Sequence, residues 1–171
     1  MLGIKDYNPK IYTNPSSILK DHKVQLERLK GKHIKEIWVA WEQASNEWFR
    51  DCPVIIRFEE CQIELCAFKW NEYLITFDKI SVLQDIEWYG TDLPIKWKKN
   101  KIDELNFVIN KRINDIEIIE RCEGESNDFC YLDGIGFHLN DGYFAVCNGL
   151  DENLIITDRK EGPNYKRITT V

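Results

Sequence analysis

The residues best able to bind a metal ion are six cysteines and three histidines, and their spacing does not favour a metal site. Metal ligands converge at short, fixed spacings, yet the sequence contains neither a CxxC nor an HxxxH pattern. Cys61 and Cys66 are the closest cysteine pair, and they are five residues apart, which places them on opposite faces of a strand. We therefore expect no metal and no cofactor.

Acid–base or nucleophilic catalysis would require one of the three histidines. His22 falls in a predicted amphipathic helix and His33 beside a predicted turn, so both are interpreted as structural or solvated. His138 lies on a predicted strand, facing away from the core, with Asp133 and Asp141 nearby in the sequence. These three residues form the alternative ligand or acid–base site. An exposed strand histidine without a chemical role explains the same pattern.

The overall charge argues against a nucleic-acid-binding protein. The formal net charge is -6 and the pI is near 5.2, whereas affinity for DNA or RNA comes largely from Lys and Arg that neutralise phosphates. Four lysines between Lys96 and Lys101 surround Trp97 and resemble a small stacking site. A solubilising turn accounts for them equally, so a nucleic-acid partner is not expected.

The N-terminal sequence indicates a cytoplasmic protein. Charged and proline residues interrupt Met1–Lys20, so no apolar region of a signal peptide is present there. No run approaches the roughly 18 apolar residues of a membrane-spanning helix, and no membrane association is expected. In a reducing compartment the six cysteines are expected to be free thiols.

An internal repeat organises the chain. Leu29–Ile37 aligns with Val108–Ile116 at an offset of 79 residues, with three identical positions. Further matches follow, and the offset changes only at predicted turns, where length changes are tolerated. Chance similarity between two β-rich segments of biased composition is the competing explanation.

Local patterns predict one helix and several strands in each unit. Apolar spacing predicts a helix over 16–30, capped by Asn14 or Ser16 and closed by Gly31, and a shorter one over 103–109. Asn110 aligns with Gly31, and both residue types tolerate the left-handed conformation that ends a helix. Strands rich in β-branched and aromatic residues are predicted at 34–42, 54–59, 62–68, 73–78, 113–120, 130–139, 143–148 and 153–158.

These elements predict an α+β fold with two pseudo-symmetric helix-plus-antiparallel-meander units sharing one core. The single domain spans 1–171, with units at about 16–87 and 102–160 joined by 88–101. With one helix and about four short strands each, the units are expected to share an interface rather than fold alone. The pattern leaves open whether they form one sheet or two, and which oligomeric state results.

Several aromatic residues fall outside the predicted core and become candidate partner contacts. Trp38 aligns with Glu117, so the repeat releases Trp38 from the core and strand alternation turns it outward. Trp48 and Phe49 lie in one predicted loop, and Trp88 lies in the segment joining the units. Trp and aromatic residues in such segments are often interface anchors. Capping of the core where the units meet is the alternative.

The acidic residues are concentrated in the predicted meanders. Residues 36–93 carry an excess of carboxylates, among them Glu59, Glu60 and Glu64, whereas residues 1–35 are net positive. An acidic face would speed capture of a basic protein, although a merely solvated sheet face is the simpler explanation.

The stretches Asp133–Phe144 and Asn148–Asn153 resemble the antiparallel hairpins of small cytoplasmic immunity proteins that accompany bacterial polymorphic toxins. The abundance of Ile, Lys and Asn beside few Ala is also typical of AT-rich bacterial genomes. The resemblance implies a non-enzymatic inhibitor that blocks a toxin domain. It covers about a sixth of the chain and assigns no binding residue.

The sequence therefore favours a cytoplasmic, non-enzymatic protein-binding module whose partner is another protein. The resemblance implies an immunity protein, and the acidic face would suit a basic partner. Its candidate contacts are Trp38, Trp48, Phe49, Glu59, Glu60, Glu64 and Trp88. A small-ligand binder or enzyme using a groove between the units, with His138, Asp133 and Asp141, is the first alternative. A structural subunit of an assembly is the second.

Overall fold

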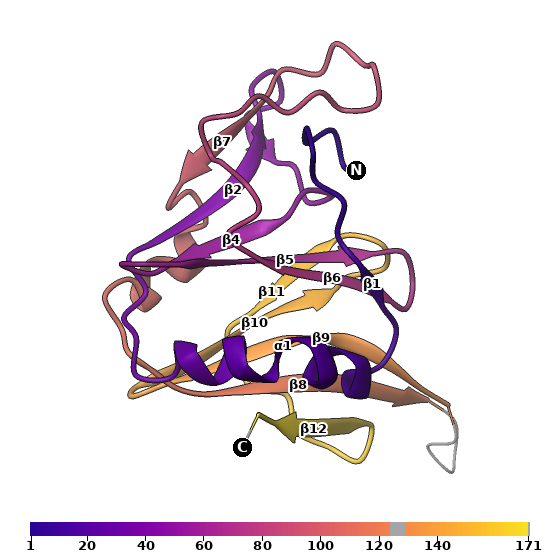
Figure 1. Ribbon diagram of the computed structural model, residues 1–171, viewed down its shortest axis with the longest axis vertical. Helices are drawn as coiled ribbons and strands as arrows, with labels where there is room; N and C mark the ends of the chain where they lie inside the picture. The colour runs from indigo at the N-terminus through magenta and orange to yellow at the C-terminus, as the bar shows by residue number, and fades with distance from the viewer. Residues whose placement is uncertain (124–128, 171) are drawn as a thin grey trace.

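The computed structural model describes residues 1–123 and 129–170 and shows an α+β protein with two antiparallel sheets (Figure 1). The predicted α+β class with antiparallel sheet is thereby confirmed, and the two meanders form two sheets rather than one. None of the helices in the described part of the chain is long and apolar enough to cross a membrane.

The first sheet has seven strands in the spatial order β1-β6-β5-β4-β2-β3, with β7 also paired to β2. Its predicted central strands are confirmed to within about two residues at each end. The bounds are β1 Ile11–Tyr12, β2 Glu36–Glu42, β3 Glu47–Trp48, β4 Val54–Arg57, β5 Gln62–Phe68, β6 Glu72–Phe77 and β7 Ile95–Lys99.

The second sheet has five strands in the order β11-β10-β9-β8-β12. The bounds are β8 Ile113–Glu123, β9 Phe129–Leu139, β10 Gly142–Asn148, β11 Asn153–Ile156 and β12 Tyr165–Thr169. In the first sheet the meander strands β2, β4, β5 and β6 follow chain order, and β7 returns to pair with β2. In the second sheet β8 to β11 follow chain order, and β12 returns to pair with β8. The segment 88–101, expected as a connector, thus contains a strand of the first sheet.

The helix α1 (Pro15–Leu29) begins as the sequence predicts. The Asn14 side chain accepts a hydrogen bond from the Ser17 backbone N–H at 3.0 Å, and Pro15 occupies the first turn, where its missing N–H costs nothing. The second predicted helix is the 3-10 helix η1 (Asp103–Val108). It is too short to bury a face comparable to that of α1.

The chain segments that follow α1 and η1 bond to each other reciprocally. Gly31 donates its backbone N–H to Ile113 O at 2.7 Å, and Asn110 donates its own to Ile34 O, also at 2.7 Å. Between them His33 and Arg112 form an antiparallel bridge. Gly31 has φ 82° and Asn110 has φ 64°, which confirms the predicted left-handed helix ends.

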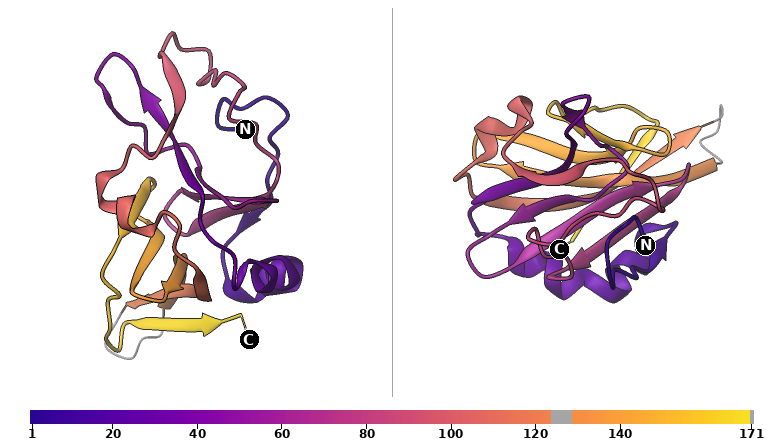
Figure 2. Two further views of the ribbon diagram at one scale, coloured as in Figure 1. Left: turned by 90° about the vertical axis from the view of Figure 1, so that its left-hand side faces the viewer. Right: turned by 90° about the horizontal axis from the view of Figure 1, so that it is seen from above.

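The main hydrophobic core lies between the inner faces of the two sheets, and α1 closes one side of it (Figure 2). Ile18, Leu26 and Leu29 supply the buried face of α1. Across the core, the Tyr73 hydroxyl donates to Val146 O at 2.7 Å, so the two sheets are joined by a polar contact as well as by packing. Neither sheet could bury its inner face alone.

Each sheet also has an outer face that peripheral segments cover. The N-terminal residues and the segment after β6 pack on the outer face of the first sheet around Leu2, Ile4, Ile86 and Cys66. Trp38 points to this face, as predicted, but it is half-buried rather than exposed, because these segments cover it. The outer face of the second sheet carries a smaller cluster around Tyr143 and Cys147.

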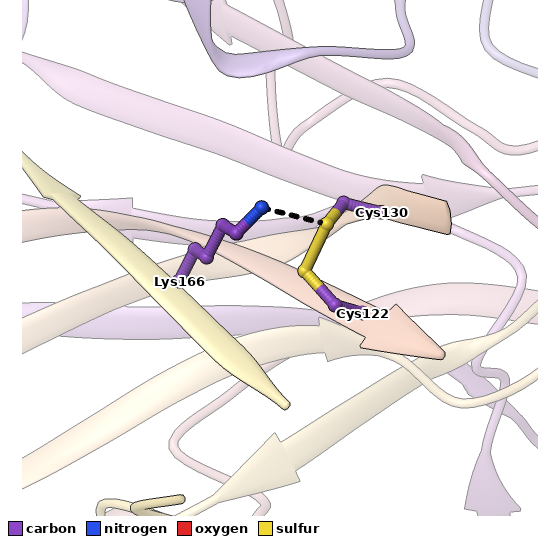
Figure 3. Close-up of a disulfide and its surroundings, with 3 residues drawn as sticks. All are labelled: Cys122, Cys130 and Lys166. Carbon is purple, nitrogen blue, oxygen red and sulfur yellow. Dashed lines mark hydrogen bonds between the residues drawn. A yellow bond between two sulfur atoms is a disulfide. The ribbon is translucent and has the colours of Figure 1, made fainter. Parts of the chain in front are cut away.

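The expectation of six free thiols is wrong at one pair. Cys122 and Cys130 lie directly opposite each other on β8 and β9 and form a disulfide (Figure 3). The Lys166 ammonium lies 3.1 Å from the Cys130 sulfur. A reducing compartment would favour free thiols, whereas strand register places these two sulfurs within bonding distance. The remaining free cysteines are Cys52, Cys61, Cys66 and Cys147.

Substitution at the two helix ends should distinguish their backbone requirements. Gly31→Ala should lower the free energy of unfolding by about 1 kcal/mol, because alanine is strained at a positive φ although its Cβ would meet no neighbour. Asn110→Gly, which keeps the left-handed conformation accessible, should change stability by less than about 0.5 kcal/mol. Urea denaturation measures both. Equal losses in the two variants would contradict a left-handed requirement at Gly31.

Removal of the disulfide should destabilise the fold moderately. The double substitution Cys122→Ala, Cys130→Ala should lower the free energy of unfolding by about 2–3 kcal/mol, because the lost crosslink closed a short loop in the unfolded chain. Urea denaturation of the oxidised protein measures this loss. A reducing agent should destabilise the wild type similarly and leave the double variant unchanged. Six titratable thiols in the unreduced, unfolded wild type would show that the bond does not form.

Candidate functional site

The segment 80–94 forms a fixed loop across the outer face of the first sheet. Ile80 and Ile86 anchor it by burial, and Ile4 forms an antiparallel bridge with Ile86. The Glu87 backbone N–H donates to Gly3 O at 2.7 Å. A Cβ at Gly3 would lie 2.6 Å from Glu87 O, so this close approach requires glycine. The loop backbone is therefore held by the N-terminal residues.

This anchored loop presents large apolar side chains to water. Leu83 is 92% exposed, Tyr89 64% and Leu93 38%. Behind them, Trp88 makes edge-to-face contacts with Phe49 and with Tyr89, each at 4.8 Å between ring centroids. The aromatic rings thus support one another while the loop's outer side chains stay uncovered.

The same loop is acidic. Asp85, Glu87 and Asp92 are exposed, and the sequence has no Lys or Arg between Lys79 and Lys96. A groove of about 500 Å³ runs beside it, lined by Asp85, Glu87 and Tyr89 and also by N-terminal residues that include Lys5. We call the exposed residues Leu83, Asp85, Glu87, Tyr89, Asp92 and Leu93, with Phe49 and Trp88 behind them, the loop surface.

Only part of the predicted aromatic set belongs to this surface. Phe49 and Trp88 are brought together there, whereas Trp38 lies half-buried on the same side with its indole N–H donated to Glu36 at 2.8 Å. Trp48 instead packs against the core between the sheets, with the Arg50 guanidinium 5.0 Å from its ring. Sequence reasoning could not separate these residues, because neighbouring loop positions can point to different layers.

The predicted acidic contacts do not form one surface. Glu59 and Glu60 are exposed at the turn before β5, where Glu60 lies 3.8 Å from Lys32 and away from residues 80–94. Glu64 is fully buried, so it offers no contact to a partner. The reason is that the outer face of β5 is covered, which strand alternation alone does not reveal.

Glu64 is a buried carboxylate held by neutral donors. It accepts hydrogen bonds from the Gln62 side chain at 2.6 Å and from the backbone N–H groups of Lys79 at 3.0 Å and Ile80 at 3.3 Å, and the Thr76 hydroxyl donates to its other oxygen. Burial raises the pKa of Glu64, and the hydrogen bonds only partly oppose this. Glu64 therefore fixes the turn that leads into segment 80–94.

His138 is not paired with either predicted carboxylate. Its Nε2 lies 3.0 Å from Glu117 on β8, whereas Asp141 is bound to Lys111 at 2.6 Å. Asp133 shares the outer face with His138 because a register shift inserts it as an extra residue in β9, where its carboxylate contacts Cys147. The predicted trio is thus divided among three separate contacts.

Glu117 is the centre of the His138 cluster. Its buried carboxylate accepts hydrogen bonds from Tyr143 at 3.0 Å, from Arg159 at 3.1 Å and from Arg167. Burial alone would raise the pKa of Glu117, but the hydrogen bonds from Arg159 and His138 and the charge of Arg167 outweigh it and lower the pKa. Such a carboxylate is a poor base. Its contacts fasten the C-terminal segment to the sheet.

Within residues 1–123 and 129–170, no three His, Cys, Asp or Glu side chains are grouped so that they could hold a metal ion. Comparison with known proteins found no matching family model, no matching curated protein and no matching solved structure. The exposed residues of the loop surface that the sequence reasoning missed are Leu83, Asp85, Glu87, Tyr89, Asp92 and Leu93. The sequence feature that could have indicated them is that residues 80–94 are acidic and contain large apolar residues without the alternation of a strand.

The two buried glutamates should affect stability with opposite pH dependence. The raised pKa of Glu64 gives stability that is present below the ordinary pKa of 4.5 and is lost as pH rises toward the raised pKa. Glu64→Gln should therefore gain stability relative to wild type as pH rises above about 4.5. The lowered pKa of Glu117 gives stability lost as pH falls, so Glu117→Gln should cost about 3 kcal/mol near pH 7 and less at low pH.

Urea denaturation at several pH values measures both effects. Glu59→Gln, at an exposed position in the turn before β5, serves as the control and should follow the wild type throughout. Parallel pH profiles for Glu64→Gln and the wild type would contradict the assignment for Glu64.

Proposed function

We propose that the protein is a non-enzymatic binding module that captures a basic protein through the loop surface, acting as an immunity protein that neutralises a toxin domain. The observation that carries this proposal is the exposure of Leu83, Tyr89 and Leu93 on an anchored, acidic loop. Exposed apolar groups held in a fixed arrangement are typical of interaction sites, because a fixed loop loses little conformational entropy when a partner binds.

The charge of the loop surface supports a basic partner. Asp85, Glu87 and Asp92 surround the apolar side chains with no cation from the same segment. Complementary charge raises the rate of encounter and disfavours acidic competitors, while the apolar centre supplies the affinity. A patch of this composition fits an inhibitor that must bind one protein quickly.

We infer that the two units are pseudo-symmetric copies, and the reciprocal bonds of Gly31 and Asn110 support this relation. The common strand order of the two sheets supports it too. Under this relation residues 78–94, between β6 and β7, correspond to residues 157–164, between β11 and β12. The first segment is much longer, and its additional residues carry the loop surface. Residues present in one unit alone are free to serve binding rather than the shared core.

The partner is sought first in the DNA beside the gene. An adjacent reading frame for a long exported protein would supply a candidate toxin domain, which should arrest growth when expressed alone and not when this chain is co-expressed. Neighbouring genes for metabolic enzymes alone, or no rescue of growth by this chain, would contradict the immunity role.

Substitutions on the loop surface test where the partner binds. Leu83→Ser with Tyr89→Ser should weaken binding of the purified toxin domain at least 10-fold, or about 1.4 kcal/mol, measured by calorimetry. Asp85→Lys with Glu87→Lys should slow association and reduce its salt dependence. Leu150→Ser, at a position 77% exposed on the β10–β11 turn, is the matched control and should bind like the wild type. Equal affinity in all variants would place the contact elsewhere.

A further inference from the structure

A second, separate cavity lies between the two sheets. It has a volume of about 400 Å³, within the range of small-molecule sites. Trp41 on β2 and Trp48 on β3 line it from the first sheet, and Leu154 and Ile155 line it from β11 of the second. Lys101 and Ile102, just before η1, complete it. We call this the inter-sheet groove, and none of its lining residues belongs to the loop surface.

The walls of the groove are fixed relative to each other by Asn153. Its side chain accepts the Ala67 N–H at 2.8 Å and donates to Arg50 O at 2.6 Å and Cys52 O at 2.8 Å. These bonds join the start of β11 to two segments of the first unit. The groove is therefore preformed, which reduces the entropy that a ligand would lose on ordering it.

The lining combines apolar surface with an excess of hydrogen-bond donors. Lys101 lies 5.3 Å from the Trp41 ring and Arg50 lies 5.0 Å from the Trp48 ring. Lys101 is exposed and, among the described residues, has no carboxylate within ion-pair distance, whereas the buried indole N–H of Trp48 has no hydrogen-bond acceptor. The Arg50 guanidinium forms an ion pair with Glu152 at 3.3 Å. Glu104 is the one carboxylate among the residues that line the groove.

We propose that the inter-sheet groove binds a small anion with a flat apolar body, such as an aromatic carboxylate. The apolar body would lie against the indole rings and the aliphatic side chains of Leu154 and Ile155, where its burial removes apolar surface from water. The carboxylate would accept from the Lys101 ammonium, which stands at the groove without a carboxylate partner of its own among the described residues.

The length of β11 favours a small molecule over an extended peptide. A peptide that adds a strand needs a run of free backbone groups on an edge strand. β11 has four residues, and the N–H of its first, Asn153, already donates to Arg50 O at 3.1 Å. Too little of the edge is left to pair with a peptide strand.

Binding of naphthalene-2-carboxylate to the full-length protein tests the proposal, and calorimetry is the measurement. We expect a dissociation constant below about 1 mM for the carboxylate and at least fivefold weaker binding of the neutral naphthalene-2-carboxamide, which has the same shape. Lys101→Gln should weaken the carboxylate at least fivefold and leave the carboxamide unchanged. Lys20→Gln, an exposed lysine on α1, which does not line the groove, is the matched control and should bind as the wild type does.

A second variant tests the location rather than the charge. Thr157→Trp should fill the groove and abolish binding of both compounds, with unfolding in urea checked to confirm that the variant is folded. Equal binding of carboxylate and carboxamide, an unchanged affinity in Lys101→Gln, or binding retained in Thr157→Trp would each overturn the proposal. So would displacement of the probe by an acidic hexapeptide of higher affinity. Loop-surface variants should bind the probe normally, so failure of the protein-binding proposal is distinguished from failure of this one.

Discussion

Each sheet has an inner apolar face that water would otherwise reach, and the other sheet is its main cover. α1 and η1 add a narrow apolar stripe at the sides, but most of the central cluster comes from strands of both sheets. This mutual burial fixes the positions of all other features, because loops and grooves are defined only once the sheets are docked. The Tyr73 hydroxyl and the Asn153 amide then satisfy backbone groups at the seam that packing alone would leave without partners.

The outer faces show two solutions to burying a carboxylate. Glu64 is surrounded by neutral donors and holds a turn of the first sheet, so burial dominates its protonation. Glu117 is surrounded by guanidinium groups and a phenol and holds the C-terminal segment, so the cations dominate. Both residues are structural. Their contacts also explain why peripheral segments without long strands are ordered against the sheets.

With the cores covered, two features have side chains that packing within the fold does not explain. The loop surface exposes apolar and acidic side chains that the chain could have replaced by neutral polar ones without loss of packing. The inter-sheet groove holds the exposed ammonium of Lys101 and the buried indole N–H of Trp48, which has no acceptor among the described residues. The first suits a protein partner because its exposed side chains are spread along residues 83–93, whereas the second suits a small ligand because side chains from both sheets line it. The two proposals therefore rest on different atoms.

The sequence by itself determined the elements that depend on local interactions. Helix capping at Asn14, the left-handed residues Gly31 and Asn110, and the alternating strands follow from conformational preferences of near neighbours, and the structure places them as predicted to within a few residues. The antiparallel meanders also follow, since short turns between strands leave few other pairings. Of the residues that form the loop surface, the sequence predicted only Phe49 and Trp88 as partner contacts.

Only the tertiary structure decided which faces are covered and which residues meet. Glu64 looked like a surface carboxylate because alternation gives the face of a residue and not what lies over it. His138 meets Glu117 rather than Asp133, and Cys122 meets Cys130, because register across strands is set by the whole sheet. Exposure, strand register and the groove between the sheets are properties of docked layers, and no local pattern in the chain encodes them.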